Sequence, residues 1–593
     1  MASNWDSLTS VDGKEELLSH LQRMADFLKQ HEVLWRAHLV SFFQERLWEK
    51  MDKEWSKSLE HVAVQELLKL PLGITHDGWP SSLREFASIA RSLSLFRKPK
   101  SSNHMVSKPP PINHVLAQGM NSKKLHEVEI LGAVVAHFAE KVKATDVIDV
   151  GAGQGYLAQV LSFQYELPVI AIDCCSHHMD VTKKRAAQIQ KHYKARVQKD
   201  QWGQSAFPGP RTLTYHFGAV ETPTLLPLLN SILLSESAAA SNKPRNISVL
   251  DDGNPLQDKS TCLDATNCFG SSQPSGKHGD IRSVVVAGLH ACGDLSANML
   301  RNFLDCDEVN AVVCVGCCYN LLSEGHNCGF PLSEGVKNAG LLLDRSGRDL
   351  ACQSAERWSS MRPEAAAQNF QVHTFRAAFQ LVLQRYYPKV AAANPCVGRL
   401  GKARRRKQTC KGLPLTTSGS KLPEISLQVE HLQLDIESAT TDQSNPDKSV
   451  ESFGQRDTTE KVIGCITEID PISQSRQSYL EKDYIKESLL GFQEYAKTAL
   501  KRLRLPEVPE KELVSIWEEI EPYMALVGVF WSLRAVLAPV LESYILLDRL
   551  LFLKEQALKA NNEDRETIIS QLVPLFDPLV SPRNMAIVAM RCA

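Results

Sequence analysis

Apolar residues in the first part of the chain recur every three or four positions, which predicts helices. The run LLSHLQRMADFLKQHEVLWRAHLVSFFQERLWEKM (17–51) keeps this spacing with charged residues between, and LREFASIARSLSLF (83–96) repeats it. The consecutive prolines of SKPPPINH (107–114) cannot continue a helix. We therefore predict a helical N-terminal region over residues 1–115.

The pattern then changes to short, fully apolar runs that alternate with helical stretches. These runs are DVIDV (146–150), PVIAID (168–173), TLTYHFGAV (212–220), SVVVAGL (283–289) and NAVVCVG (310–316). Apolar strands separated by helices are typical of a parallel sheet covered on both faces. We predict an α/β, Rossmann-like sheet in residues 116–398.

Two polar stretches interrupt the pattern, at 235–281 and 399–480, and neither can bury enough apolar surface to form a core. We expect both to be disordered. The segment 481–593 is helical again and closes with two strands, QLVPLF and NMAIVAMR, which we expect to complete the same domain. Its longest apolar stretch, 526–553, contains four charged residues, so it predicts a buried helix pair and not a membrane span.

Composition narrows the class of protein. The chain has 593 residues with 67 Lys and Arg against 68 Asp and Glu, and 43% of its residues are hydrophobic. A net charge of −1 excludes a strongly basic protein that coats nucleic acid, but allows a local basic patch. The N-terminus has no pattern of a secretory signal, and 15 cysteines without such a signal predict reduced thiols in the cytoplasm or nucleus.

The clearest chemical signal is the loop VIDVGAGQGYL, in which Asp149 precedes Gly151, Gly153 and Gly155. Glycines let the backbone turn sharply and approach a ligand. A dinucleotide fingerprint would need a third glycine where Tyr156 stands. An acid before the first glycine would repel a pyrophosphate but suits a cationic amine. The loop therefore predicts S-adenosylmethionine as cofactor. Its expected contacts are Asp149, Gly151, Gly153, Gly155 and Tyr156.

Two further strand ends complete the predicted cofactor site. Asp173 ends the second strand, where a carboxylate can accept both ribose hydroxyls. The third strand should place Ala219, or its neighbours Gly218 and Val220, beside the adenine.

The fourth strand ends in GLHACGDL (288–295), at the edge where ligands bind in such sheets. His290 is our catalytic candidate, as a general base or as a donor that positions the substrate. The alternative is a histidine that only caps the turn. For Asp294, we expect a helix N-cap.

Cysteines gather near the end of the fifth strand, in VGCCYNLL (315–322). Adjacent cysteines on a strand point to opposite faces, and no second CxxC pairs with Cys314 and Cys317, so we predict no metal site. Small buried thiols are the simplest interpretation, and a nucleophilic Cys292 or Cys317 is the alternative. Cys317 and Tyr319 remain candidate substrate contacts.

Basic residues suggest an anionic partner at two places. Lys123, Lys124 and His126 lie with Glu127 within about one helical turn, where they can share one end of the cofactor cleft or form a solvated helix start. The run RLGKARRRKQTCK (399–411) has seven basic residues and no acid, and it suits RNA phosphates or nuclear import.

Together MNSKKLHEV, DVGAGQGYL, GLHACGDL, VGCCYNLL and the tail LAPVLESYILLDRLLFLKEQ…LFDPLVSPRNMAIVAMR resemble the methyltransferase-like protein 25 family. The resemblance runs from about residue 30 to the C-terminus outside the two insertions. It implies a class I S-adenosylmethionine-dependent methyltransferase fold whose last strand is antiparallel between its neighbours. GLHACG is also similar to a motif of tRNA 2′-O-methyltransferases.

The chain departs from the adenine dimethylases, because Leu289-His290-Ala291-Cys292 stands where they carry an Asn/Asp-Pro-Pro-aromatic motif. We expect an RNA methyltransferase that does not bind membranes. A protein methyltransferase and a non-catalytic binding module are the alternatives. The sequence defines no oligomeric state.

Overall fold

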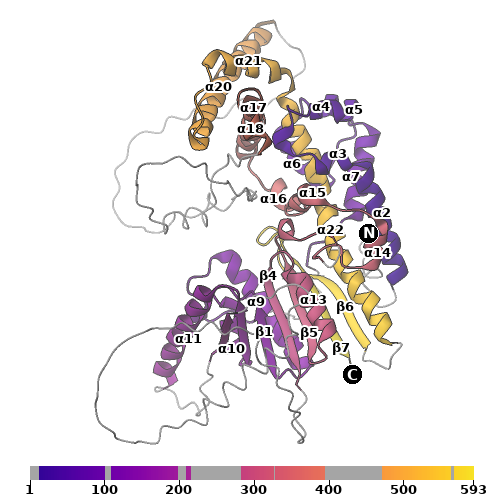
Figure 1. Ribbon diagram of the computed structural model, residues 1–593, viewed down its shortest axis with the longest axis vertical. Coiled ribbons are helices and arrows are strands. Elements are labelled where there is room, and N and C mark those ends of the chain that lie inside the picture. The colour runs from indigo at the N-terminus through magenta and orange to yellow at the C-terminus, as the bar shows by residue number, and fades with distance from the viewer. Residues whose placement is uncertain are drawn as a thin grey trace, which may run out of the picture. The chain divides into compact units, whose positions relative to one another are not determined.

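The computed structural model describes residues 13–99, 109–197, 209–214, 282–325, 328–393, 471–561 and 567–592. The chain forms two compact units, and many of their elements are labelled in Figure 1. Unit 1 comprises Met1–Ala25, Leu95–Leu342 and Tyr544–Ala593, and unit 2 comprises Asp26–Ser94 and Leu343–Ser543. The predicted helical N-terminal region, residues 1–115, is therefore divided between the two units.

Unit 1 is built on a seven-stranded sheet of order β3-β2-β1-β4-β5-β7-β6. Its strands are β1 (Asp146–Val150), β2 (Val169–Asp173), β3 (Arg211–Thr214), β4 (Val284–Ala291), β5 (Val309–Gly316), β6 (Thr567–Pro574) and β7 (Met585–Cys592). The first five are parallel, and β7 is antiparallel to both β5 and β6. The predicted α/β sheet with an antiparallel last strand is confirmed.

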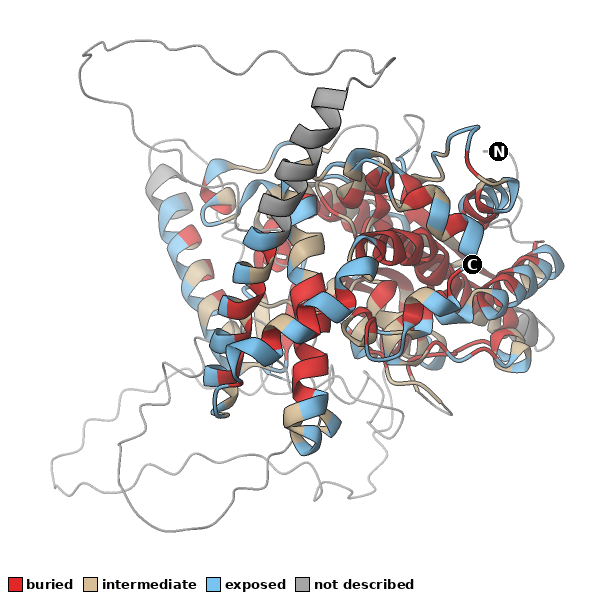
Figure 2. Ribbon diagram, turned by 90° about the horizontal axis from the view of Figure 1, so that it is seen from above, coloured by how far each residue is buried: buried red, intermediate tan, exposed pale blue. Residues whose placement is uncertain are grey.

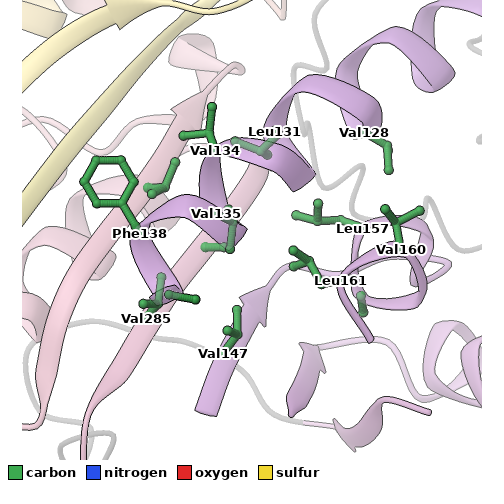
Figure 3. Close-up of a cluster of buried hydrophobic side chains, with 14 of the residues drawn as sticks. Val128, Leu131, Val134, Val135, Phe138, Val147, Leu157, Val160, Leu161 and Val285 are labelled. Carbon is green, nitrogen blue, oxygen red and sulfur yellow. The ribbon is translucent and has the colours of Figure 1, made fainter. Parts of the chain in front are cut away.

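Both faces of this sheet are covered, as the apolar strands predict. Figure 3 shows α9 (Ser122–Lys141) and α10 (Tyr156–Phe163) on the face that carries Val147 and Val285. The opposite face meets α13 (Leu295–Asp305), where the Met299 side chain lies against Gly288. The other helical elements of unit 1 are α8 (His114–Ala117), α11 (Ser176–Val197), η3 (Tyr319–Leu321) and α14 (Glu334–Ala339).

Unit 2 is helical. Its elements are α3 (Glu32–Arg36), η1 (Leu39–Ser41), α4 (Leu47–Lys50), α5 (Lys53–Leu59), α6 (Val64–Lys69), η2 (Leu70–Leu72), α7 (Ser81–Leu93), α15 (Asp344–Leu350), α16 (Ala355–Ser359), α17 (Pro363–Tyr386), α18 (Pro388–Ala392), α20 (Pro471–Leu503), α21 (Glu510–Ile520) and η5 (Glu521–Tyr523). Aromatic rings fill its core, where Trp531 lies edge-on to Trp358 and His373 at 4.6 and 4.1 Å between ring centroids. Two helices, α2 (Lys14–Gln30) and α22 (Ala525–Asn561), run through the boundaries between the units.

The long apolar stretch 526–553 forms one helix, α22, and not the expected pair. Pro539 lies inside it, and Ser543 Oγ donates a hydrogen bond to the Pro539 carbonyl. Helix α20 likewise begins at Pro471, inside the range 399–480 that we expected to be disordered. The insertion 235–281 lies outside the described residues.

Burial follows the expected amphipathic pattern, since many helices in Figure 2 carry buried residues along one side and exposed residues along the other. Within the described ranges, no single helix is both long enough and apolar enough to cross a membrane. One pair bent by 56°, Glu510–Tyr523 with Ala525–Ala557, meets these criteria of length and composition only when the two are taken together.

Candidate functional site

The loop after β1 needs its glycines. Gly151, Gly153 and Gly155 have φ of +71°, +56° and +71°, a region that side chains with a Cβ rarely adopt. The loop is fixed to β2, because the amides of Gly151 and Ala152 both donate to the Ile172 carbonyl at 2.8 and 3.0 Å. The sharp turn inferred from the sequence is therefore present, and α10 begins directly after it at Tyr156.

The three glycines face different surroundings. A Cβ at Gly155 would lie 2.6 Å from Thr182 Oγ1, and one at Gly151 would lie 3.0 Å from the Leu295 side chain. A Cβ at Gly153 would meet nothing within 4 Å. Gly155 and Gly151 therefore allow close packing, whereas Gly153 marks the open side of the loop.

Asp149 lies buried beneath this loop, with 2% of its surface exposed. Burial raises its pKa to about 7, and the charge of Asp173 adds to this against a hydrogen bond from the Ala158 amide. Its Oδ2 has no hydrogen-bond partner among the described residues. A buried carboxylate oxygen without a donor is costly, and a ligand ammonium would satisfy it.

Asp173 joins the ends of β1 and β2. Its Oδ2 accepts from the Gly153 amide at 2.8 Å, and its Oδ1 accepts from the Cys175 amide at 2.9 Å and lies 3.1 Å from His178 Nδ1. A carboxylate oxygen can accept more than one hydrogen bond, so the group retains acceptor capacity for a ribose hydroxyl. Asp149 and Asp173 thus present carboxylate oxygens beside the open side of the loop at Gly153.

Tyr156 has a packing role in this structure. Its hydroxyl donates to the Gly119 carbonyl at 2.8 Å, and the cations of Lys124 and Arg185 lie 4.3 and 4.0 Å from its ring centroid. Its contact with a cofactor stays a prediction. Ala219, expected beside the adenine, lies outside the described residues.

His290, the second-last residue of β4, is held by a buried acid. Its Nε2 lies 3.0 Å from Glu127 Oε2, and Ser581 donates to Glu127 Oε1 at 2.6 Å. Lys123 Nζ is 3.9 Å from the same Oε1. His290 has φ of +61°, and such backbone outliers in non-glycine residues cluster at functional sites.

The charge of Glu127 decides which nitrogen of His290 is available. Burial alone would raise the pKa of Glu127, which is 1% exposed, but the hydrogen bond and charge of His290, with Lys123 and Ser581, lower it overall. The ionised carboxylate can only accept, so it holds a proton of His290 on Nε2. When the ring is neutral, its lone pair is therefore on Nδ1.

The basic residues of α9 do not share one partner. Lys123 faces Glu127, Lys124 lies over Tyr156, and His126 Nε2 accepts from the Asp577 amide at 3.1 Å. Successive helix positions point in different directions, which explains the separate partners. The place of these residues at one end of the cofactor cleft stays a prediction.

Two predictions for the ends of β4 and β5 need correction. Asp294 occupies the N-cap position of α13, but its side chain makes no cap and instead accepts from the Ser323 amide at 2.8 Å. The thiols of the adjacent Cys317 and Cys318 were expected to point to opposite faces, yet they lie together with that of Cys292. Cys317 and Cys318 follow the last residue of β5, so the alternation of strand side chains does not apply to them.

Tyr319, a predicted substrate contact, is 2% exposed. The guanidinium groups of Arg549 and Arg583 each lie 5.7 Å from its ring centroid. Nothing in the sequence indicated that these arginines, more than 200 positions later, would reach the end of β5.

Residues 123–325 match a protein family described as "Methyltransferase domain". A Homo sapiens protein named "Probable methyltransferase-like protein 25" is 23% identical over 97% of this chain and 97% of its own length. A Mus musculus protein of the same name is 25% identical over 80% of this chain and 75% of its own length. No solved structure gives a significant match.

Proposed function

Because the chain belongs to the methyltransferase-like protein 25 family, we propose that it transfers a methyl group from S-adenosylmethionine to RNA. The observation that carries the cofactor assignment is the buried, unpartnered Oδ2 of Asp149 beneath the glycine loop. In this proposal Asp149 holds the ammonium of the cofactor, and Asp173 accepts from its ribose. When bound, the cofactor supplies an electrophilic methyl group on a sulfonium.

His290 is the proposed general base. Its Nδ1 takes the proton from the acceptor, and the carboxylate of Glu127, 3.0 Å from Nε2, stabilises the imidazolium that forms. Glu127 acts as a positioning residue, because it fixes the ring and its tautomer without reaching the acceptor. The other contribution of the chain is to hold the two reactants in line.

An anionic acceptor is supported by two features of the sequence. The basic run 399–411, outside the described residues, supplies seven cations. GLHACG is similar to a motif of tRNA-modifying enzymes.

A protein acceptor is the second candidate, since a net charge of −1 favours RNA no more than protein. RNA binding whose affinity falls steeply with salt would favour the first candidate, because counterions are released from the phosphates. Methyl transfer to protein fractions alone would favour the second.

The cofactor is tested by calorimetric titration of the full chain with S-adenosylmethionine and S-adenosylhomocysteine. We expect binding that Asp149→Ala abolishes. Asp146→Asn is a matched control, because Asp146 lies on the same strand but pairs with Arg211. No binding by folded wild-type protein would refute the proposal. Radiolabelled methyl transfer to RNA and protein fractions then identifies the acceptor.

A further inference from the structure

Three thiols meet beyond the ends of β4 and β5. The Sγ atoms of Cys292 and Cys317 are 3.1 Å apart, those of Cys292 and Cys318 are 3.3 Å apart, and those of Cys317 and Cys318 are 3.4 Å apart. Cys292 is exposed and the other two are half-buried. Cys292 lies in the loop after β4, and Cys317 and Cys318 lie in the loop after β5. Solvent reaches the cluster through Cys292.

Contacts that do not involve sulfur hold these loops together. The Gly293 amide donates to the Cys318 carbonyl at 3.3 Å, and a Cβ at Gly293 would lie 2.8 Å from the Leu321 carbonyl oxygen. The Asp294 carboxylate accepts from the amide and the hydroxyl of Ser323. The backbone thus brings the three cysteines to one point whatever the state of their thiols.

Three thiolates held this close together would repel one another. A divalent cation removes this repulsion and binds the thiolate forms. Thiolates select thiophilic ions, of which Zn²⁺ is the common protein-bound one.

The distances suit one ion bound by all three sulfurs. With Zn–S bonds of about 2.3 Å and a tetrahedral angle, sulfur ligands lie roughly 3.8 Å apart. The three thiols are a few tenths of an ångström closer than this, which small side-chain rotations can correct. A disulfide, with sulfurs about 2.05 Å apart, would use only two of the three.

We propose that Cys292, Cys317 and Cys318 bind one Zn²⁺ through three thiolates and leave its fourth coordination position open to solvent. Among the described residues, no fourth His, Cys, Asp or Glu joins this group. Three protein ligands with one exchangeable position is the arrangement of catalytic zinc sites.

The proposed zinc site lies at the same edge of the sheet as the glycine loop. The cluster lies at the carboxyl ends of β4 and β5, next to β1 and its glycine loop, and Cys292 is two residues after His290. If the chain transfers methyl groups, which rests on the function proposed above, the open position faces the edge of the sheet where the acceptor binds.

The test is the zinc content of the full-length protein, purified under reducing conditions and measured by mass spectrometry. We expect about one Zn²⁺ per chain, and we expect each of Cys292→Ser, Cys317→Ser and Cys318→Ser to lose most of it. Cys174→Ser is the matched control, since Cys174 is also exposed but lies after β2. Folded wild-type protein without zinc, or cysteine variants that keep it, would overturn the proposal.

Two measurements need no variant. Co²⁺ exchanged into the wild-type protein should give thiolate-to-cobalt charge-transfer absorption, and its d–d bands should shift when a small exogenous thiol occupies the open position. Zinc should also protect the three cysteines from alkylation, as mapped by peptide mass spectrometry. Equal alkylation with and without zinc would refute the site. Calorimetric titration with S-adenosylmethionine separates this result from the cofactor proposal.

Discussion

The affinity for S-adenosylmethionine should depend on pH through Asp149. Burial, with the charge of Asp173, raises the pKa of this carboxyl from 3.8 to about 7. The ionised form binds the ligand ammonium through a charge-assisted hydrogen bond, which the neutral carboxyl cannot provide. The affinity should therefore rise as the pH rises through about 7, and the protonated form should weaken binding below it.

The size of the effect follows from the ionised fraction. For a site that binds only when ionised, the apparent Kd at pH 6 is roughly tenfold higher than at pH 8, or about 1.4 kcal/mol. At pH 7 binding should release about half a proton. Calorimetry at pH 6, 7 and 8, in two buffers of different ionisation enthalpy, measures both quantities.

The variant Asp149→Asn provides the control, because it keeps the size of the side chain and removes its charge. The α-amino group of the ligand also titrates, near pH 8, and the ratio of wild-type to variant affinity cancels that contribution. A ratio that stays flat between pH 6 and pH 8, or a variant that binds as tightly as wild type, would refute the reasoning.

Three further perturbations test neighbouring parts of the site. The native pKa of Asp149 lies above its unfolded value. The stability that its protonated form contributes is therefore lost as the pH rises through about 7. Asp149→Asn should raise the Tm of the ligand-free protein more at pH 8 than at pH 6. Gly153→Ala should lower the free energy of unfolding by about 1–2 kcal/mol because of its positive φ, and it should weaken cofactor binding. A Cβ at Gly155 would also meet Thr182, so Gly155→Ala should lower the Tm further in the same thermal melts. Glu127→Gln should lower kcat by tenfold or more with the Kd for cofactor unchanged, and a parallel loss of binding would indicate a merely structural role.

Local patterns predicted the sheet and the glycine loop well, because both depend on residues adjacent in sequence. The apolar run of β1 leads directly into Gly151 and Gly153, and their need for positive φ can be inferred from spacing alone. Asp173 was predictable for the same reason, as the polar residue that ends an apolar strand.

Contacts between distant segments were not predictable. Glu127 and His290 are 163 residues apart, and Ser581 reaches the same carboxylate from the loop between β6 and β7. The convergence of Cys292 with Cys317 depends on how two loops leave the sheet, which strand periodicity does not describe. Such pairings are set by tertiary packing, and one sequence contains no direct record of them.

The position of β7 in the sheet governs when unit 1 can be completed during synthesis. β7 separates β5 from β6, yet it begins about 270 residues after β5 ends. At a synthesis rate of ~5–20 residues per second, β5 leaves the ribosome roughly 15 to 50 s before its partner. Throughout that interval the nascent chain presents an unpaired, apolar strand edge, which is a template for wrong pairing. Chaperone dependence during translation should therefore be concentrated in the synthesis of residues 317–584.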